Sequence, residues 1–258
     1  IQSFDDADLK FMNRSHNAKQ ALNCIQLAKE VGFKNITIDL IYGLPNQSNE
    51  KWEQNLKQML ALDVQHFSAY ALTVEPKTAL KHLIDKKKIT PLEEKITVEH
   101  FNTLVRIATE NNFIHYEISN FGKEGFFSNH NTAYWKNQHY LGVGPSAHSF
   151  NGTSRQWNIA NNRKYIEKVN KNEAYFEVEK LSNAQQYNEY IFTALRTIWG
   201  VELDYITTQF GEEAQQYFEK QVQNWLAQNK IKQLEDTYTL TGTGKLYADA
   251  IASDLFIV

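Results

Sequence analysis

Cysteine is almost absent from this sequence. The chain of 258 residues has one, Cys24, so it can form no internal disulfide and cannot by itself build a cysteine-based metal cluster. Such a composition fits a reducing, cytoplasmic setting. Long apolar runs are absent as well, since none approaches the roughly 20 residues that span a bilayer. The opening residues are polar and acidic, so we expect no secretory signal peptide there.

An excess of basic charge is also missing. Lysine and arginine number 27 against 30 aspartates and glutamates, and this balance gives no sign of a general nucleic-acid binder or a membrane-surface protein. The chain does have 42% apolar residues, which suffices for a core, and a length compatible with two domains. It starts with Ile rather than Met and enters a patterned segment at once. We therefore expect a piece of a longer polypeptide.

A nearly continuous apolar run, residues 36–41, organises the first half of the chain. Such a run predicts a strand buried on both faces, as in a parallel sheet, and amphipathic helical patterns flank it. Helix, buried strand and helix in that order are typical of an α/β fold. Tyr42-Gly43-Leu44-Pro45 ends the strand, and ligands of parallel α/β proteins collect at such ends. Asp39 is then either satisfied by the backbone or a basic neighbour, or it faces a ligand.

Helix caps and apolar spacing predict the neighbouring elements. Cys24 is expected to lie buried or half-buried within a helix, and a capping box at Thr90-Pro91-Leu92-Glu93 predicts a helix start. The expected helices are residues 5–12, a helix capped by Asn17 and ended by Gly32, a helix capped by Ser48 or Asn49, and residues 90–111; the expected strands after the central one are 66–72 and 113–119.

The second half of the chain begins with an irregular stretch, residues 120–152. It is rich in Gly, Asn, His and aromatics, which indicates a functional loop rather than disorder. Helices are then expected over 161–170 and 181–199. The tail, with two helices, a hairpin and a last helix, resembles a winged-helix module. It has no basic cluster on a plausible recognition helix, so we interpret it as a packing or protein-contact module rather than a DNA-binding regulator.

Two segments of the irregular stretch carry residues suited to chemistry. The first segment is His130-Asn131-Thr132-Ala133-Tyr134-Trp135. In one interpretation, the histidine is a haem or metal ligand and the two aromatic rings stack on a flat molecule. In the other, the segment is an aromatic loop without a chemical role. Gly142-Val143-Gly144-Pro145 is a tight turn that either exposes N–H groups to an anion or is purely structural.

The order of several motifs resembles one known family, the oxygen-independent coproporphyrinogen III oxidase family of radical S-adenosylmethionine proteins. The chain is most similar to its HemW-like branch of haem chaperones, and the resemblance covers essentially the whole sequence. The motifs are Gln2-Ser3-Phe4-Asp5-Asp6, Asn13-Arg14-Ser15-His16, Asp39 to Pro45, Ser68-Ala69-Tyr70, Leu72 to Pro76, His115 to Phe121, His130-Asn131-x-x-Tyr134-Trp135, and Gly142-x-Gly144-Pro145-x-Ala147-His148-Ser149.

The resemblance implies a fold and a set of ligands. The fold class is α/β: residues 1–118 are the second half of an incomplete (β/α)6 radical-SAM TIM-like barrel. Residues 119–258 are an α+β C-terminal domain that includes the loop region 120–152 and a helical, winged-helix-like module at 181–258. Gln2, Arg14 and Asp39 match residues that hold S-adenosylmethionine, and Ala71 lies where a backbone contact is made. The side chains suit the task, since Arg can pair with a carboxylate and Asp can accept from ribose hydroxyls. His130 matches a histidine associated with haem.

The resemblance also has departures. The family's CxxxCxxC loop is not in this chain, so the chain should hold no [4Fe-4S] cluster and should be inactive alone as an oxidoreductase. Ser146 stands where the family more often has Gly. The expected function of the full-length protein is haem binding and delivery to an acceptor protein. The alternative is oxidative decarboxylation of coproporphyrinogen. Haem or porphyrin is the expected partner, together with a homodimer contact; nucleic acid and a membrane span are not expected.

Overall fold

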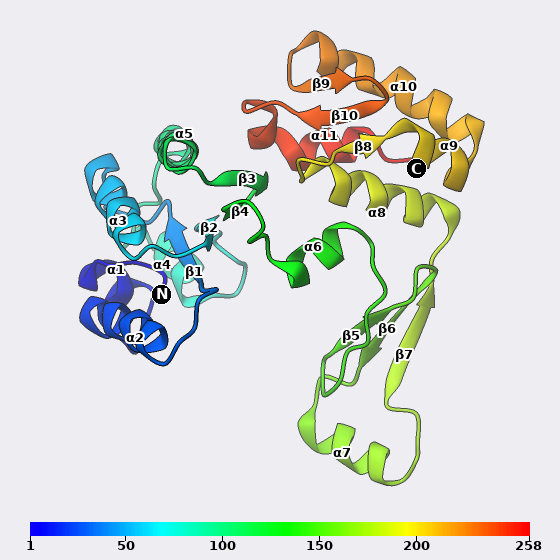
Figure 1. The fold of residues 1–258 in the computed structure, drawn as a ribbon. Coiled ribbons are helices and arrows are strands. Elements are labelled where there is room, and N and C mark those ends of the chain that lie inside the picture. Colours follow the sequence, from blue (N-terminus) through cyan, green and yellow to red (C-terminus); the bar gives the residue numbers. More distant parts are fainter. The chain divides into compact units, whose positions relative to one another are not determined.

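The computed structural model describes all of residues 1–258, which form two compact units, Ile1–Ser128 and Asn129–Val258 (Figure 1). The division falls later than the boundary at residue 118 expected from the sequence. The reason is that the strand Asn120–Gly122 pairs within the sheet of the first unit. None of the helices combines the length and the apolar content that crossing a membrane requires.

The first unit is a mixed four-stranded sheet with helices. The strand order is β1-β2-β4-β3, in which β1 and β2 are parallel and β4 is antiparallel to both of its neighbours. The sheet is open, and no closed barrel forms. The elements are α1 (Asp6–Phe11), α2 (Ala18–Glu30), β1 (Thr37–Tyr42), α3 (Asn49–Ala61), β2 (His66–Ala71), α4 (Ala79–Asp85), α5 (Glu94–Glu110), β3 (Ile114–Glu117) and β4 (Asn120–Gly122).

The core of this unit lies on one face of the sheet, against α2, α3 and α5. Trp52 of α3 is fully buried, packs against Tyr42 with 5.4 Å between ring centroids and a tilt of 33°, and donates its indole N–H to His100 O over 3.0 Å. In β1 the side chains alternate: Ile38 and Leu40 are buried, whereas Asp39 is exposed. The expectation of a strand buried on both faces is therefore wrong for β1, because Thr37 and Asp39 on its second face are exposed.

Local cap signals predicted some helix starts and missed others. Asn17 caps α2 in a reciprocal box with Gln20, and Ser48 caps α3, as expected. The box predicted at Thr90 is wrong: α5 starts later, after Glu93, and no side chain caps it. The helix α4 was not predicted. Cys24 is exposed, contrary to expectation, because it lies on the outer side of α2.

The second unit contains two three-stranded antiparallel sheets. One has the order β5-β6-β7, with α7 at one end (Figure 1), and the other has the order β8-β10-β9 and packs with helices α8 to α11. The elements are α6 (Asn129–Trp135), β5 (His148–Phe150), β6 (Ser154–Asn158), α7 (Asn162–Asn170), β7 (Phe176–Lys180), α8 (Asn183–Leu195), β8 (Val201–Glu202), α9 (Leu203–Phe210), α10 (Glu212–Ala227), β9 (Ile231–Leu234), β10 (Thr237–Leu240), a 3-10 helix (Gly244–Tyr247) and α11 (Ala248–Asp254). A capping box between Ser182 and Gln185 caps the N-terminus of α8.

Candidate functional site

The sheet face opposite the core of the first unit carries Asp39. The parallel register pairs Asp39 with Ser68, so the two side chains lie on the same face. The Asp39 carboxylate is exposed and makes no hydrogen bond or ion pair within the protein. The sequence left two alternatives for Asp39, a side chain bonded to the backbone or to a basic neighbour, and a side chain that faces a ligand. The first is therefore wrong. A carboxylate without internal partners is available to a ligand.

Two more of the predicted residues belong to the same sheet. The Gln2 carbonyl accepts a hydrogen bond of 2.8 Å from Ile41 N, which places Gln2 along the outer side of β1. Ala71 ends β2 in register with Tyr42, and Leu72 N donates to Tyr42 O over 2.8 Å. Gln2, Asp39 and Ala71 are therefore gathered on neighbouring backbone segments.

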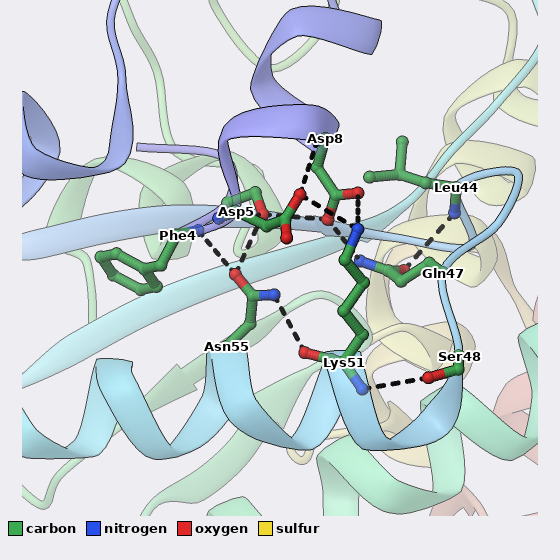
Figure 2. Close-up of polar contacts among 9 residues, drawn as sticks. Phe4, Asp5, Asp8, Leu44, Gln47, Ser48, Lys51 and Asn55 are labelled. Atoms are coloured by element: carbon green, nitrogen blue, oxygen red, sulfur yellow. Dashed lines mark hydrogen bonds and ion pairs between the residues drawn. The ribbon is translucent and has the colours of Figure 1, made fainter.

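A polar network, here called the α1–α3 clamp, holds the segment that follows Gln2 (Figure 2). It consists of Ser3, Asp5, Asp8, Lys51 and Asn55. Ser3 Oγ lies 3.1 Å from Asp8 Oδ2 and 3.0 Å from Asn55 Oδ1. Asn55 Oδ1 also accepts from the Phe4 backbone N–H over 2.6 Å. Because Asn55 comes from the buried face of α3, the clamp ties the chain beside Gln2 to the core.

Lys51 supplies the positive charge of the clamp. Its Nζ lies 3.0 Å from both Asp5 Oδ1 and Asp8 Oδ1. Burial raises the pKa of Asp5, but hydrogen bonds from Asp8 N and Lys51 outweigh it and hold that pKa below its usual value. Burial lowers the pKa of Lys51, yet the two carboxylates raise it overall. Asp5 and Lys51 therefore stay charged near neutral pH.

Arg14 lies elsewhere on the first unit, in the loop between α1 and α2. Its backbone N–H donates to Leu9 O over 2.9 Å, and Asn13 before it has a φ of 54°. The exposed side chain helps to line a pocket of about 320 Å³ with Lys10 and His16, and that pocket includes none of Gln2, Asp39 and Ala71. The structure therefore brings three of the four predicted residues together and leaves Arg14 in a separate, more basic hollow.

Next to Asp39, a histidine links three strands of the sheet. His66 Nδ1 lies 2.6 Å from Thr37 Oγ1, and His66 Nε2 lies 2.8 Å from Tyr116 OH. Burial lowers the pKa of His66 to about 4, so the imidazole is neutral at pH 7. A neutral imidazole donates from one nitrogen and accepts at the other, and both neighbours carry a hydroxyl that can serve either role. The three groups form a continuous hydrogen-bonded chain across β1, β2 and β3.

A second polar chain crosses the same face. Ser68 Oγ donates to Asn120 Oδ1 over 2.7 Å, and Asn120 Nδ2 donates to Glu117 Oε2. Glu117 is only 1% exposed, and it also accepts from Ser119 N over 3.0 Å. Sequence reasoning missed His66, Ser68 and Asn120 as parts of the site. The signal was present in β2, where polar and apolar residues alternate from His66 to Ala69.

In the second unit, His130 lies on α6, so the stretch expected to be irregular is partly helical. His130 and Tyr134 are four residues apart and share a helix face, where their rings meet edge to face at 4.9 Å. Tyr134 also contacts Tyr140 at 4.7 Å. The residues that follow, Leu141 and Val143, are 80% and 83% exposed. His130 is itself exposed and makes no hydrogen bond within the protein.

The Gly142–Pro145 turn is structural. Gly142 N donates to Ser149 Oγ over 3.0 Å, Gly144 N to Tyr165 OH over 3.3 Å and Ser146 N to Ile159 O over 3.2 Å. These N–H groups are thus already used, which rules against the alternative of an anion cradle. A side chain at position 142 would collide with His148 O, which explains the glycine. Ser146 adopts a φ of 61°, the left-handed conformation that a Gly would take more easily.

Comparisons with known proteins match both ends of the chain. Residues 1–59 match the family model of the radical SAM superfamily, and residues 181–247 match that of the HemN C-terminal domain. In fold, the chain is similar to the coproporphyrinogen III oxidase HemN from Escherichia coli, a radical SAM enzyme. The TM-score is 0.79 at 18% sequence identity, over 99% of this chain and 62% of the other. The class is thereby defined: this is a radical SAM protein with a HemN-type C-terminal domain.

Curated relatives place the chain more narrowly. It is 31% identical to the heme chaperone HemW of Bacillus subtilis strain 168 over 252 residues, which are 97% of this chain and 66% of the relative. It is 28% identical over 258 residues to the heme chaperone HemW of Haemophilus influenzae, covering 100% of this chain and 66% of the relative. The protein is a HemW- and HemN-like member of the radical SAM class. The chain spans just under two thirds of the length of these relatives.

The residues of the chain fit some cofactors of this class and not others. Radical SAM proteins use S-adenosylmethionine and a [4Fe-4S] cluster. The lone, exposed Cys24 cannot supply the thiolates of such a cluster, and no group of three His, Cys, Asp or Glu side chains is placed to hold a metal ion. Asp39 and Arg14 have side chains without internal partners, so they fit the polar groups of S-adenosylmethionine. The unpartnered His130 likewise fits an axial haem ligand.

Proposed function

We propose that this protein binds haem, or a related porphyrin, on α6 and delivers it to an acceptor protein in the cytoplasm. The observation that carries the proposal is the exposed His130 beside Tyr134. A haem needs an axial ligand on its iron and an apolar surface for its flat ring. His130 supplies the first. Tyr134, Leu141 and Val143, all exposed, supply apolar surface of the kind that the second requires.

The second part of the proposal concerns the open face of the first unit. Gln2, Asp39 and Ala71 would hold the nucleoside part of S-adenosylmethionine. Arg14, which lines a separate pocket, would pair with the carboxylate where that end of the ligand extends toward the loop between α1 and α2. The absence of internal partners for Asp39 and Arg14 supports these roles. The sheet is then the later part of an incomplete (β/α)6 barrel. The order of helices and strands in residues 181–258 is winged-helix-like and serves protein contact, including contact with a second copy of the chain.

The alternative function, oxidation of coproporphyrinogen, has weaker support. The likeness to the Escherichia coli oxidase is one of fold, at 18% identity. The relatives that match nearly the whole chain at 28% and 31% identity are named heme chaperones.

Haem titration of the chain tests the proposal. A shift of the haem Soret band on binding is expected, and His130→Ala should abolish the band of the histidine-ligated iron. His82→Ala is the matched control, because His82 is also an exposed histidine on a short helix. A Soret band that does not shift, or that shifts equally in His130→Ala, would contradict haem binding at this histidine.

A further inference from the structure

A pocket of about 270 Å³ in the second unit is lined by ten residues, four of which are aromatic. The end of α6, the helix α8 and the segment from Trp199 to Tyr205 form it. Among the residues that line it are Trp135, Lys136, Tyr190, Trp199, Glu202 and Tyr205. The four aromatic residues are Trp135, Tyr190, Trp199 and Tyr205, and Glu202 is the one carboxylate among the ten.

The rings of the pocket are held in place by the fold. Tyr190 and Tyr205 pack at 4.3 Å between ring centroids with an angle of 31° between their planes. The Tyr190 hydroxyl accepts a hydrogen bond of 2.8 Å from Glu202 N, which joins α8 to β8. Burial raises the pKa of Tyr190 well above its usual range, so the ring stays neutral. A preorganised set of neutral rings presents electron-rich faces to an occupant.

Cations of the chain already lie over two of these rings, since the Arg196 guanidinium carbon is 5.7 Å from the Trp135 ring centroid. Lys136 Nζ lies 4.4 Å from the centroid of the Trp199 ring. Lys136 is exposed and makes no ion pair, so its ammonium group is held there mainly by the ring. Glu202, also exposed, has no cationic partner within the protein. The pocket thus offers ring faces and a free carboxylate, which are the two features that attract a positive charge.

Trp135 adds a hydrogen-bond donor. Its Nε1 atom is buried and has no acceptor in the protein. A buried donor without a partner is costly, so an occupant whose carbonyl oxygen reached Nε1 would gain a hydrogen bond. A basic amino-acid residue within a peptide has both groups, a cation at the end of its side chain and a carbonyl in its backbone.

We infer that this pocket binds the ammonium or guanidinium group of a lysine or arginine side chain from a protein partner. Lys136 occupies the place of that group when no partner is bound. The site is separate from the haem surface: Tyr134 faces His130, whereas Trp135 lies against Arg196, with 5.7 Å between the guanidinium carbon and the ring centroid. The inference therefore does not depend on haem binding.

The test is a titration with blocked amino acids, followed by tryptophan fluorescence and NMR. The probes are N-acetyl-lysine methylamide and its arginine counterpart, with the norleucine and glutamate counterparts as uncharged and anionic controls. We expect the two cationic probes to bind and both controls to fail. Butylamine, which lacks the carbonyl, should bind about tenfold more weakly than the lysine probe. Equal binding of butylamine would assign the site to free amines and overturn a peptide partner, and preferential binding of the glutamate probe would overturn the cation site altogether.

Three variants sharpen the test. Lys136→Met removes the internal competitor and should tighten binding of the lysine probe several-fold, whereas an anion site predicts a loss. Glu202→Gln should weaken binding about threefold, and Trp199→Leu should weaken it at least tenfold. Lys136 and Glu202 are exposed, so their variants report on the site even if Trp199→Leu fails to fold. Unchanged affinity in both exposed variants would overturn the proposal.

Discussion

Lys51 Nζ lies 3.0 Å from Asp8 Oδ1, and the side chain of Asp8 is only 5% exposed. The pair joins α1 to α3 and fixes the backbone beside Gln2. An ion pair of this kind stabilises little by itself, but removing one partner leaves the other charge without compensation. A single substitution in the α1–α3 clamp should therefore have a clear effect on the free energy of unfolding.

Lys51→Met should lower the free energy of unfolding by about 2 kcal/mol, because the nearly buried side chain of Asp8 would lose its cationic partner. Lys81→Met is the matched control. Lys81 pairs with Asp85 at 2.6 Å, but both side chains are about half exposed, at 45% and 58%. Its loss should cost less than about 0.5 kcal/mol. Urea unfolding measures both, and equal losses in the two variants would contradict a special role for the clamp.

His66 should make the stability of the first unit depend on pH. Its pKa is about 4 in the folded protein and about 6.5 when unfolded. Between these values the unfolded chain binds more protons, so stability is complete above pH 6.5 and falls as the pH drops toward 4. The loss should approach about 3 kcal/mol. His66→Gln should flatten this part of a urea-denaturation profile, and a slope unchanged by the substitution would refute the assignment.

Asp39→Ala should separate ligand binding from stability. The carboxylate is exposed and has no internal partner, so we expect a change in unfolding free energy within about 0.5 kcal/mol. Binding of S-adenosylhomocysteine, followed by saturation-transfer difference NMR, should be lost. Asp254→Ala, at another exposed aspartate without an internal partner, is the control for charge. Retained binding in Asp39→Ala would remove this residue from the proposed site.

Gly142→Ala should destabilise the second unit by about 2 kcal/mol or more, because the added Cβ collides with the carbonyl oxygen of His148. Gly242→Ala is the control, since a Cβ there meets no atom within 4 Å. Thermal unfolding monitored by near-UV circular dichroism compares the two. A smaller effect at Gly142 than at Gly242 would show that the turn can relax.

Several parts of the fold that depend on neighbouring residues were predictable, although the capping box at Thr90 was not among them. The parts that depend on distant pairing were not predictable. Asn17 and Ser48 cap their helices through backbone groups three residues away, so the sequence carries the whole signal. The strand expected over residues 113–119 breaks because β4 returns and pairs between β2 and β3, with a register shift between His115 and Glu117. Nothing in those residues alone specifies that pairing.

The candidate site follows the same rule. Asp39 was singled out as a polar residue in an apolar strand, but its exposure depends on which face the helices cover. The chain from Thr37 through His66 to Tyr116 requires three strands to be in place. His130 could be predicted as a candidate, whereas its pairing with Tyr134 follows only from the helical form of α6.

The helical form of α6 divides a motif that sequence comparison treats as one. Because adjacent residues on a helix point about 100° apart, Tyr134 and Trp135 face different neighbours. The His130–Tyr134 pair and Trp135 can then be kept or lost independently in homologues. A homologue that keeps the histidine and tyrosine but replaces the tryptophan would keep the proposed porphyrin surface and lose only the proposed recognition of a basic partner. Alignments that score the motif as a unit would then misjudge both.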